Sequence, residues 1–260
     1  MKSGPFIWIC VAFAVVVLSF LALPLVNIAT APSPGTIWES LHDGEIISAV
    51  LLSLYTSGMA AIICLILGTP FAYLLARKEF PGKNLIESIV DIPIVIPHPV
   101  AGIAILAVSG RNHWFGRMLA DLGIRIMGSP AGIITVLVFV SIPFFINAAK
   151  EGFASVPERL ENVSMTLGAS KLSTFRRITF PLAGRSMLTG TIMSAARALS
   201  EFGAVVVIAY HPMIAPVLMF ERYQAYGLEY SQPVAFILIA MSLMIFIVLR
   251  ILTSRKRRID

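Results

Sequence analysis

Long uninterrupted apolar runs restrict the fold of this chain more than any other feature. A bilayer core about 30 Å thick is crossed by a helix of about 20 apolar residues. Six segments reach that length: 6–28, 46–76, 88–108, 130–149, 186–210 and 233–252. These runs do not alternate in polarity as membrane-spanning strands do. The sequence therefore predicts an all-α, polytopic protein whose six transmembrane helices form a single domain over residues 1–260 in a lipid bilayer.

The charged residues are too few for a soluble domain. They make up 13% of the chain, whereas soluble domains carry about 25%. The net charge is +6, but the charges lie at the ends of apolar runs. We therefore interpret them as signals of membrane topology and expect no nucleic-acid partner.

The first apolar run has a second possible interpretation. It follows Met1 and Lys2 and ends in Ala29-Thr30-Ala31, which resembles a signal-peptide cleavage site. The apolar core of a signal peptide spans about 7–15 residues, and this run is longer. We expect an uncleaved transmembrane helix.

The basic residues predict the orientation. With the N-terminus inside, 4 Lys or Arg residues fall in outer loops (Arg111, Arg117, Arg125 and Arg222), and Arg197 falls within a span. The other 15 fall inside: Lys2, Arg77, Lys78, Lys83, Lys150, Arg159, Lys171, Arg176, Arg177, Arg185, Arg250, Arg255, Lys256, Arg257 and Arg258. Cytoplasmic loops are enriched in such residues. Both termini and the loop 150–185 are expected in the cytoplasm, next to the cell membrane.

The loop 150–185 has the pattern of two short helices. One apolar face recurs at helical spacing, at Val156, Leu160, Val163 and Leu167. Gly168 is expected to end the first helix. Ser170 is expected to cap the second, which contains Phe175 and is expected to end at Pro181. Such a segment either lies on lipid headgroups or docks its apolar face into a groove on a partner.

The spacing within this loop resembles the Glu-Ala-Ala loop of ABC-importer permeases. Gly168 is followed after nine residues by Ile178, and Pro181 closes the motif. The Glu-Ala-Ala positions read Asn162-Val163-Ser164, with Glu161 one place early. The resemblance implies a coupling element that docks into an ATP-binding subunit, mainly through its apolar face. The residues assigned to this role are Leu160, Glu161, Val163, Leu167, Gly168, Ala169, Ser170, Phe175 and Pro181.

Two further segments resemble the oxyanion branch of these permeases. They are residues 68–106, with Ile-Pro-His-Pro at 96–99, and residues 196–209, with Arg-Ala-Leu-Ser-Glu-Phe-Gly-Ala. The first is most similar to archaeal molybdate/tungstate permeases. The resemblance implies a type I ABC importer permease fold in which two copies form the path. It also implies two ATP-binding cassette subunits inside and an extracytoplasmic oxyanion-binding protein.

Two charged residues fall within the predicted fifth span. Arg197 and Glu201 are four residues apart and would share a helix face. An unpaired charge at the bilayer centre is costly, so we expect an ion pair that faces the bundle or water. The pair could be structural, or it could line or gate the path together with Gly203 of the same motif.

The third apolar run begins with an unusual density of prolines. Pro93, Pro97 and Pro99 each lack a backbone donor and should kink the helix. Irregular backbone at membrane depth is tolerated only where protein or water covers it. We therefore expect Pro97, His98 and Pro99 to line the path or a subunit contact. His98 could act as a hydrogen-bonding residue or contact the substrate directly.

No catalytic pattern accompanies these features. The chain lacks Walker A, His-Glu-x-x-His and Cys-x-x-Cys motifs, so we expect a transport subunit without cofactor, metal or enzymatic activity, with ATP hydrolysed by the partner. Molybdate or tungstate is the expected substrate, and sulfate or thiosulfate is the close alternative. A transporter driven by an ion gradient is the alternative from another class. Such folds often show inverted repeats, and no duplicated half is visible here.

Overall fold

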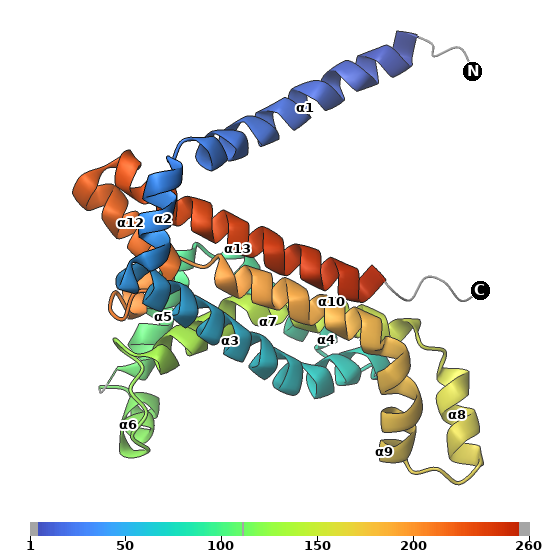
Figure 1. The fold of residues 1–260 in the computed structure, drawn as a ribbon. Helices are drawn as coiled ribbons and strands as arrows, with labels where there is room; N and C mark the ends of the chain where they lie inside the picture. The colour runs from blue at the N-terminus through green and yellow to red at the C-terminus, as the bar shows by residue number, and fades with distance from the viewer. Residues whose placement is uncertain (1–4, 111, 255–260) are drawn as a thin grey trace.

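The computed structural model describes residues 5–110 and 112–254, and every regular element in these ranges is a helix (Figure 1). This confirms the all-α prediction. The helices are α1 Pro5–Thr30, α2 Pro34–His42, α3 Gly44–Arg77, α4 Lys83–Val95, α5 His98–Ser109, α6 Trp114–Asp121, α7 Pro130–Ser155, α8 Glu158–Thr166, α9 Lys171–Thr174, the π-helix η1 Phe175–Thr179, α10 Phe180–Leu199, α11 Val205–Ile208, α12 Ala215–Tyr226 and α13 Leu228–Ser254.

Four of the described helices are long and apolar enough to cross a membrane. They cover Phe6–Thr30, Gly44–Arg77, Pro130–Ser155 and Leu228–Ile245. The bent pair formed by α4 and α5 passes the same criterion when it is taken as one span. The multi-pass membrane fold is therefore supported, and the predicted number of six spans stays a prediction.

The helices α3, α7 and α10 form the packed centre of the molecule. Small residues allow their close approach. A Cβ on Gly68 would lie 2.5 Å from Phe145 Cδ1, and a Cβ on Gly152 would lie 2.4 Å from Ser186 Cβ. Because apolar burial between helices is a weak driving force in lipid, such close packing contributes much of the association between them.

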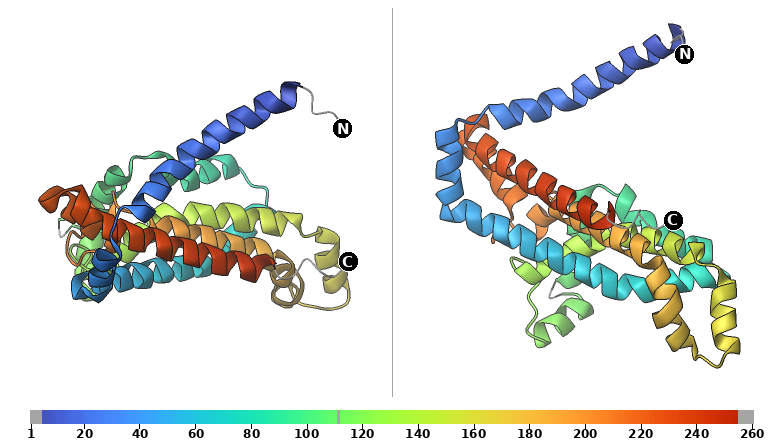
Figure 2. Two further views of the ribbon diagram at one scale, coloured as in Figure 1. Left: turned by 45° about the horizontal axis from the view of Figure 1, so that its top comes forward. Right: turned by 45° about the vertical axis from the view of Figure 1, so that its right-hand side comes forward.

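The helix α1 stands apart from this centre. It runs away from the body beyond α2 in Figure 1 and in the right-hand view of Figure 2. None of its apolar window is buried within the chain, and its apolar side chains are exposed on all faces. A helix that is apolar all round suits a membrane span.

The residues of the predicted fifth span do not form one continuous helix. The sequence predicted 186–210, but α10 begins at Phe180 and ends at Leu199. Glu201 and Ala204 then form a turn, because the Ala204 amide donates to Glu201 Oε1 at 2.8 Å and not to a helical carbonyl. Pro181 was expected to end the arm's second helix. It lies instead in the first turn of α10, directly after the π-helix η1, and the helical stretch continues through it.

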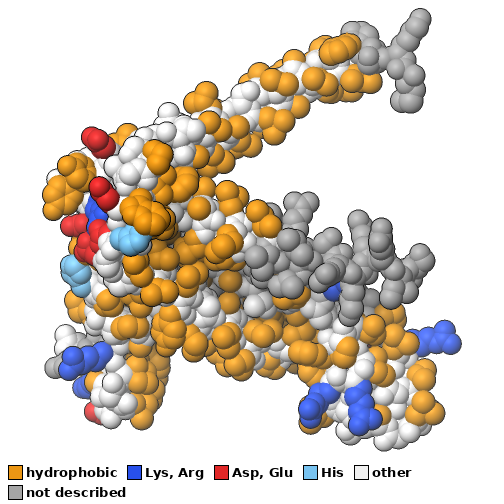
Figure 3. All heavy atoms as spheres, viewed as in Figure 1, with side chains coloured by type: hydrophobic (Ala, Val, Ile, Leu, Met, Phe, Trp, Pro, Cys, Tyr) orange, Lys and Arg blue, Asp and Glu red, His pale blue; other side chains and the backbone are white. Residues whose placement is uncertain are grey.

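The segments α8, α9 and η1 form an arm, residues 158–179, that projects from one end of the bundle (Figure 1). Lys and Arg side chains gather on the arm and near α6, whereas acidic side chains gather near α2 and α12 (Figure 3). At that second end Arg222 Nη2 bonds Asp43 Oδ2 at 2.7 Å. The predicted orientation stays a prediction. Six of the basic residues counted for it lie outside the described residues: Lys2, Arg111, Arg255, Lys256, Arg257 and Arg258.

Candidate functional site

The third apolar run is broken where the prolines predicted it. The helix α4 ends at Val95, α5 begins at His98, and the two axes differ by 113°. Pro97 occupies the N-cap position and Pro99 lies in the first turn of α5. The missing amide donors therefore fall at a helix start, where they break no helical hydrogen bond. His98, the first residue of α5, therefore lies next to the last turn of α10.

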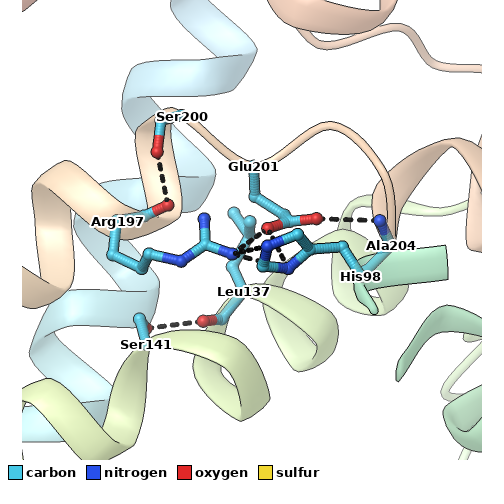
Figure 4. A network of polar contacts seen from close by, with 7 residues as sticks. All are labelled: His98, Leu137, Ser141, Arg197, Ser200, Glu201 and Ala204. Atoms are coloured by element: carbon cyan, nitrogen blue, oxygen red, sulfur yellow. Dashed lines mark hydrogen bonds and ion pairs between the residues drawn. The ribbon is translucent and has the colours of Figure 1, made fainter. Parts of the chain in front are cut away.

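His98, Arg197 and Glu201 meet in one polar cluster (Figure 4). Arg197 Nη2 lies 2.7 Å from His98 Nδ1 and donates to Glu201 Oε2. His98 Nδ1 lies 3.3 Å from the same Oε2. The ion pair expected from the four-residue spacing is confirmed. Its predicted place on one mid-span helix face is wrong, because Arg197 lies in the last turn of α10 and Glu201 lies beyond it.

Glu201 is the buried member of the cluster. Its side chain is 1% exposed, against 18% for Arg197 and 46% for His98. Oε2 accepts from Arg197, and Oε1 accepts from the Ala204 amide. A buried carboxylate is tolerated only when its oxygens are paired in this way. Glu201 therefore holds the 200–204 turn, and the half-exposed His98 ring forms the open side of the cluster.

Two glycines allow α5 to approach this turn. A Cβ on Gly203 would lie 3.0 Å from His98 Cβ, and a Cβ on Gly102 would lie 2.6 Å from the Ala204 carbonyl oxygen. The candidate residues from two segments of the sequence, 97–99 and 197–203, are thus brought together. Gly102 was missed, since a lone glycine in an apolar run gives no sign of its neighbour.

The arm has the two-helix form that its sequence predicted. Gly168 adopts a φ of 90°, between α8 and α9. Ser170 Oγ accepts from the Ser173 amide at 3.2 Å. Ser164 and Thr174 join the two helices through their hydroxyls, 2.9 Å apart. The bend at Gly168 and the cap at Ser170 are therefore confirmed.

The apolar face of the arm is uncovered in this chain. Leu160, Val163 and Leu167 are 43%, 49% and 83% exposed. The neighbouring Ala169 is half-buried. Phe175 instead points inward, with its ring 5.0 Å from that of Tyr73. The candidate coupling residues thus separate into an exposed face and an inward anchor.

Glu161 belongs to the inward set. The residue is buried. It accepts hydrogen bonds from Arg77 Nε at 3.0 Å and from Arg77 Nη2 at 2.8 Å. Thr179 Oγ1 donates to it at 2.8 Å, and Tyr73 Oη at 3.4 Å. Sequence reasoning missed Tyr73, Arg77 and Thr179. Arg77 lies at the end of an apolar run, where basic residues commonly mark the cytoplasmic side of a membrane. It was therefore counted only as evidence for the orientation of the chain.

The described residues contain no group of three or more His, Cys, Asp or Glu side chains arranged to hold a metal ion.

The chain resembles known transport proteins over nearly its whole length. Residues 68–260 match the family model described as the binding-protein-dependent transport system inner membrane component. Over 258 residues the chain is 40% identical to the molybdate/tungstate transport system permease protein of Thermococcus kodakarensis, covering 98% of this chain and 99% of that one. It is 32% identical over 225 residues to the sulfate transport system permease protein of Synechocystis, covering 85% and 79%.

A solved structure shares the fold at low sequence identity. A chain of a bacterial ABC transporter involved in the import of alginate, an acidic polysaccharide, superposes with a TM-score of 0.75 at 15% identity, covering 96% of each chain. At that identity the likeness concerns the fold alone.

Proposed function

This chain belongs to the family of binding-protein-dependent transport system inner membrane components, and from this premise we propose that it is the membrane-spanning subunit of an ATP-driven importer for molybdate and tungstate. The near-complete match to an archaeal molybdate/tungstate permease carries this proposal. The subunit performs no catalysis itself, and ATP is hydrolysed by a separate subunit.

Two copies of the chain form the translocation path, and the His98, Arg197 and Glu201 cluster faces it. Exposed apolar residues next to the break in the third run support a contact with a second copy. Val95 is 82% exposed, Val100 48% and Ile103 57%. The ion pair leaves Arg197 largely neutralised, which suits a path that a dianion must also leave, since tight binding would trap it.

The arm docks each copy onto an ATP-binding cassette subunit on the cytoplasmic side. Its exposed leucines and valine support the helix-in-groove mode of recognition. ATP-driven closure of the two cassette subunits moves the arms, and the bundles alternate between outward and inward openings. An extracytoplasmic binding protein delivers the oxyanion at the opposite face.

Reconstitution tests this proposal. The chain is placed in proteoliposomes with an ABC ATPase and a molybdate-binding protein, and uptake of molybdate is measured with and without ATP. We expect uptake only when ATP and all three components are present. Uptake driven by a proton or sodium gradient without the ATPase would overturn the proposal and favour a secondary transporter.

Sulfate is the alternative substrate, favoured by the relation to the Synechocystis sulfate permease. Molybdate, tungstate and sulfate are all tetrahedral dianions, so the path distinguishes them poorly. Exchanging the molybdate-binding protein for a sulfate-binding protein in the same vesicles separates the two readings. ATP-dependent uptake of sulfate and not of molybdate, with both receptors tested, would replace molybdate by sulfate.

A further inference from the structure

The buried polar residues at the base of the arm form a second network, distinct from the His98 cluster. We name it the Glu161 cluster: Tyr73, Arg77, Glu161 and Thr179. Its members come from three elements, since Tyr73 and Arg77 lie in α3, Glu161 in α8 and Thr179 in η1. The hydrogen bonds cross 84 and 18 positions of sequence. The cluster therefore joins segments that the chain itself does not hold together.

Arg77 is the centre of this network. Its Nε and Nη2 both donate to Glu161 Oε1, and Nη2 also donates to the Val156 carbonyl at 2.8 Å. Val156 lies in the short link between α7 and α8. A single guanidinium thus binds both the link and the first helix of the arm. The planar fork of an arginine allows this, and the point charge of a lysine does not.

The burial of the pair gives the contact its strength. The side chains of Arg77 and Glu161 are 8% and 11% exposed. Removing one partner of such a pair leaves an uncompensated charge in a poorly solvated place, which is strongly unfavourable. Most of the Glu161 surface is covered by its own chain, since the residue is buried.

The connectivity of the arm shows what this contact does. The arm is continuous with α7 through residues 155–158 and with α10 through η1. Movement of the arm therefore reaches these two helices along the chain. The helix α3 has no such link to the arm. It meets the arm through the Glu161 cluster and the ring contact between Tyr73 and Phe175.

The helix α3 also reaches the opposite end of the molecule. Its first residues follow Asp43, which is paired with Arg222 of α12. One continuous helix of 34 residues thus joins the Arg77 end to the far side of the bundle.

We propose that Arg77 and Glu161 are positioning residues that latch the arm to α3, so that movement of the arm opens and closes the path at both ends. The proposal rests on the proposed function, because the movement comes from ATP-driven docking. Without the latch, the arm still binds the ATPase through its exposed face, but α3 then follows it only indirectly, through its packing on α7 and α10. A larger share of the ATP is then hydrolysed without transport.

The test is the number of oxyanions transported per ATP hydrolysed in the complete reconstituted complex. We expect Arg77→Gln and Glu161→Gln to lower this ratio at least tenfold while the ATPase stays bound. Lys83→Gln is the matched control. Lys83, the first residue of α4, pairs with Glu79 at 2.6 Å, but the Glu79 side chain is 87% exposed, so removal of this ion pair should leave the ratio unchanged.

Thr179→Val covers the case in which the Arg77 or Glu161 variants fail to fold. It removes one donor to Glu161, keeps the ion pair and conserves shape, so we expect a smaller fall in the ratio. A wild-type ratio in every folded variant of the cluster would overturn the latch. Absence of ATP-dependent uptake by the wild-type complex would instead overturn the proposed function. Loss of ATPase binding in the variants would also contradict the latch, since it assigns docking to the exposed face.

Discussion

Glu201 carries the most demanding chemistry of any single residue here, because its carboxylate is 1% exposed and depends on Arg197 for its charge balance. The spacing of the two residues was enough to predict their pairing. The end of α10 between them was not predicted, because the apolar run continues there and gives no sign that the Glu201 side chain accepts a hydrogen bond from the Ala204 amide. His98 was found from its proline neighbours and not from any sign of its partners.

Removing Arg197 should destabilise the protein. Breaking a buried ion pair costs about 3–5 kcal/mol, and the 18% exposure of the Arg197 side chain lowers the expected loss for Arg197→Ala to about 2 kcal/mol. His98→Ala should cost much less, since that ring is 46% exposed. Thermal unfolding in detergent compares the two. An equal loss of stability in the two variants would contradict the conclusion that the Arg197–Glu201 ion pair contributes more to stability than His98 does.

Asp43 makes the α2–α3 corner sensitive to acid. The hydrogen bond from Arg222 holds the pKa of the Asp43 carboxyl below its ordinary value of 3.8. The stability from this group is therefore present above pH 3.8 and is lost as the pH falls through the lower folded pKa. Asp43→Asn should lower the melting temperature at pH 7, and its difference from wild type should shrink below pH 3.8. A difference that is constant with pH would exclude this ionisation.

At the scale of elements, the arm shows what helical periodicity can and cannot predict. The apolar spacing, Gly168 and Ser170 together predicted two short helices with a bend, and the structure has them. The direction of Glu161 could not be predicted, because its partner Arg77 lies 84 positions away. Pro181 was misplaced because a proline is equally suited to the end of one helix and the first turn of the next.

The exposed face of the arm should control association with the ATPase. Leu167 is 83% exposed, so Leu167→Lys should leave folding intact while weakening the complex at least tenfold. Leu85→Lys is the control, because Leu85 is 66% exposed in α4, outside the arm. Affinity measured by surface-immobilised ATPase checks both variants. Unchanged binding by Leu167→Lys would indicate that the arm lies on lipid.

Gly168 should be needed because its backbone adopts a positive φ, and not because a neighbouring atom leaves no room for a side chain. Its φ of 90° is strained for other residues, yet nothing lies within 4 Å of an added Cβ. We expect Gly168→Ala to cost about 1 kcal/mol in the arm and to increase proteolysis there. Gly184→Ala is the comparison, since Gly184 is helical and equally open. Equal resistance to proteolysis in both variants would contradict a conformational role.

At the scale of the whole molecule, hydropathy predicted the class of the fold, and the number of six spans that it also predicted stays a prediction. The charges of Arg185 and Arg197 fall in α10, which packs in the centre of the bundle against α3 and α7. A hydropathy profile detects helices that face lipid. A helix in the centre of the bundle carries more polar residues, so its mean hydropathy is lower and the profile identifies it less clearly. The break in the third apolar run could be predicted because Pro97 and Pro99 lie where α4 ends and α5 begins.

The isolation of α1 gives a prediction for the whole chain. Since none of its apolar window is buried in this chain, deletion of residues 1–31 should leave the melting temperature of the remaining bundle in detergent unchanged. Circular dichroism during heating measures this. A clear fall in the melting temperature would mean that α1 packs on the bundle of its own chain.

The π-helix η1 sets the angle at which the arm meets the membrane part of the molecule. The amide of Phe180 bonds the Phe175 carbonyl, five residues back, so one residue more than an α-turn holds is accommodated there. Each residue of a regular α-helix turns the chain by about 100° about the axis, so a fifth residue in a regular turn would rotate the arm by about that angle. The wider turn of η1 absorbs the fifth residue instead, so the arm keeps nearly the direction that a four-residue α-turn would give it. Loss of one residue from 175–179 is therefore expected to change the direction that Leu160, Val163 and Leu167 face only slightly.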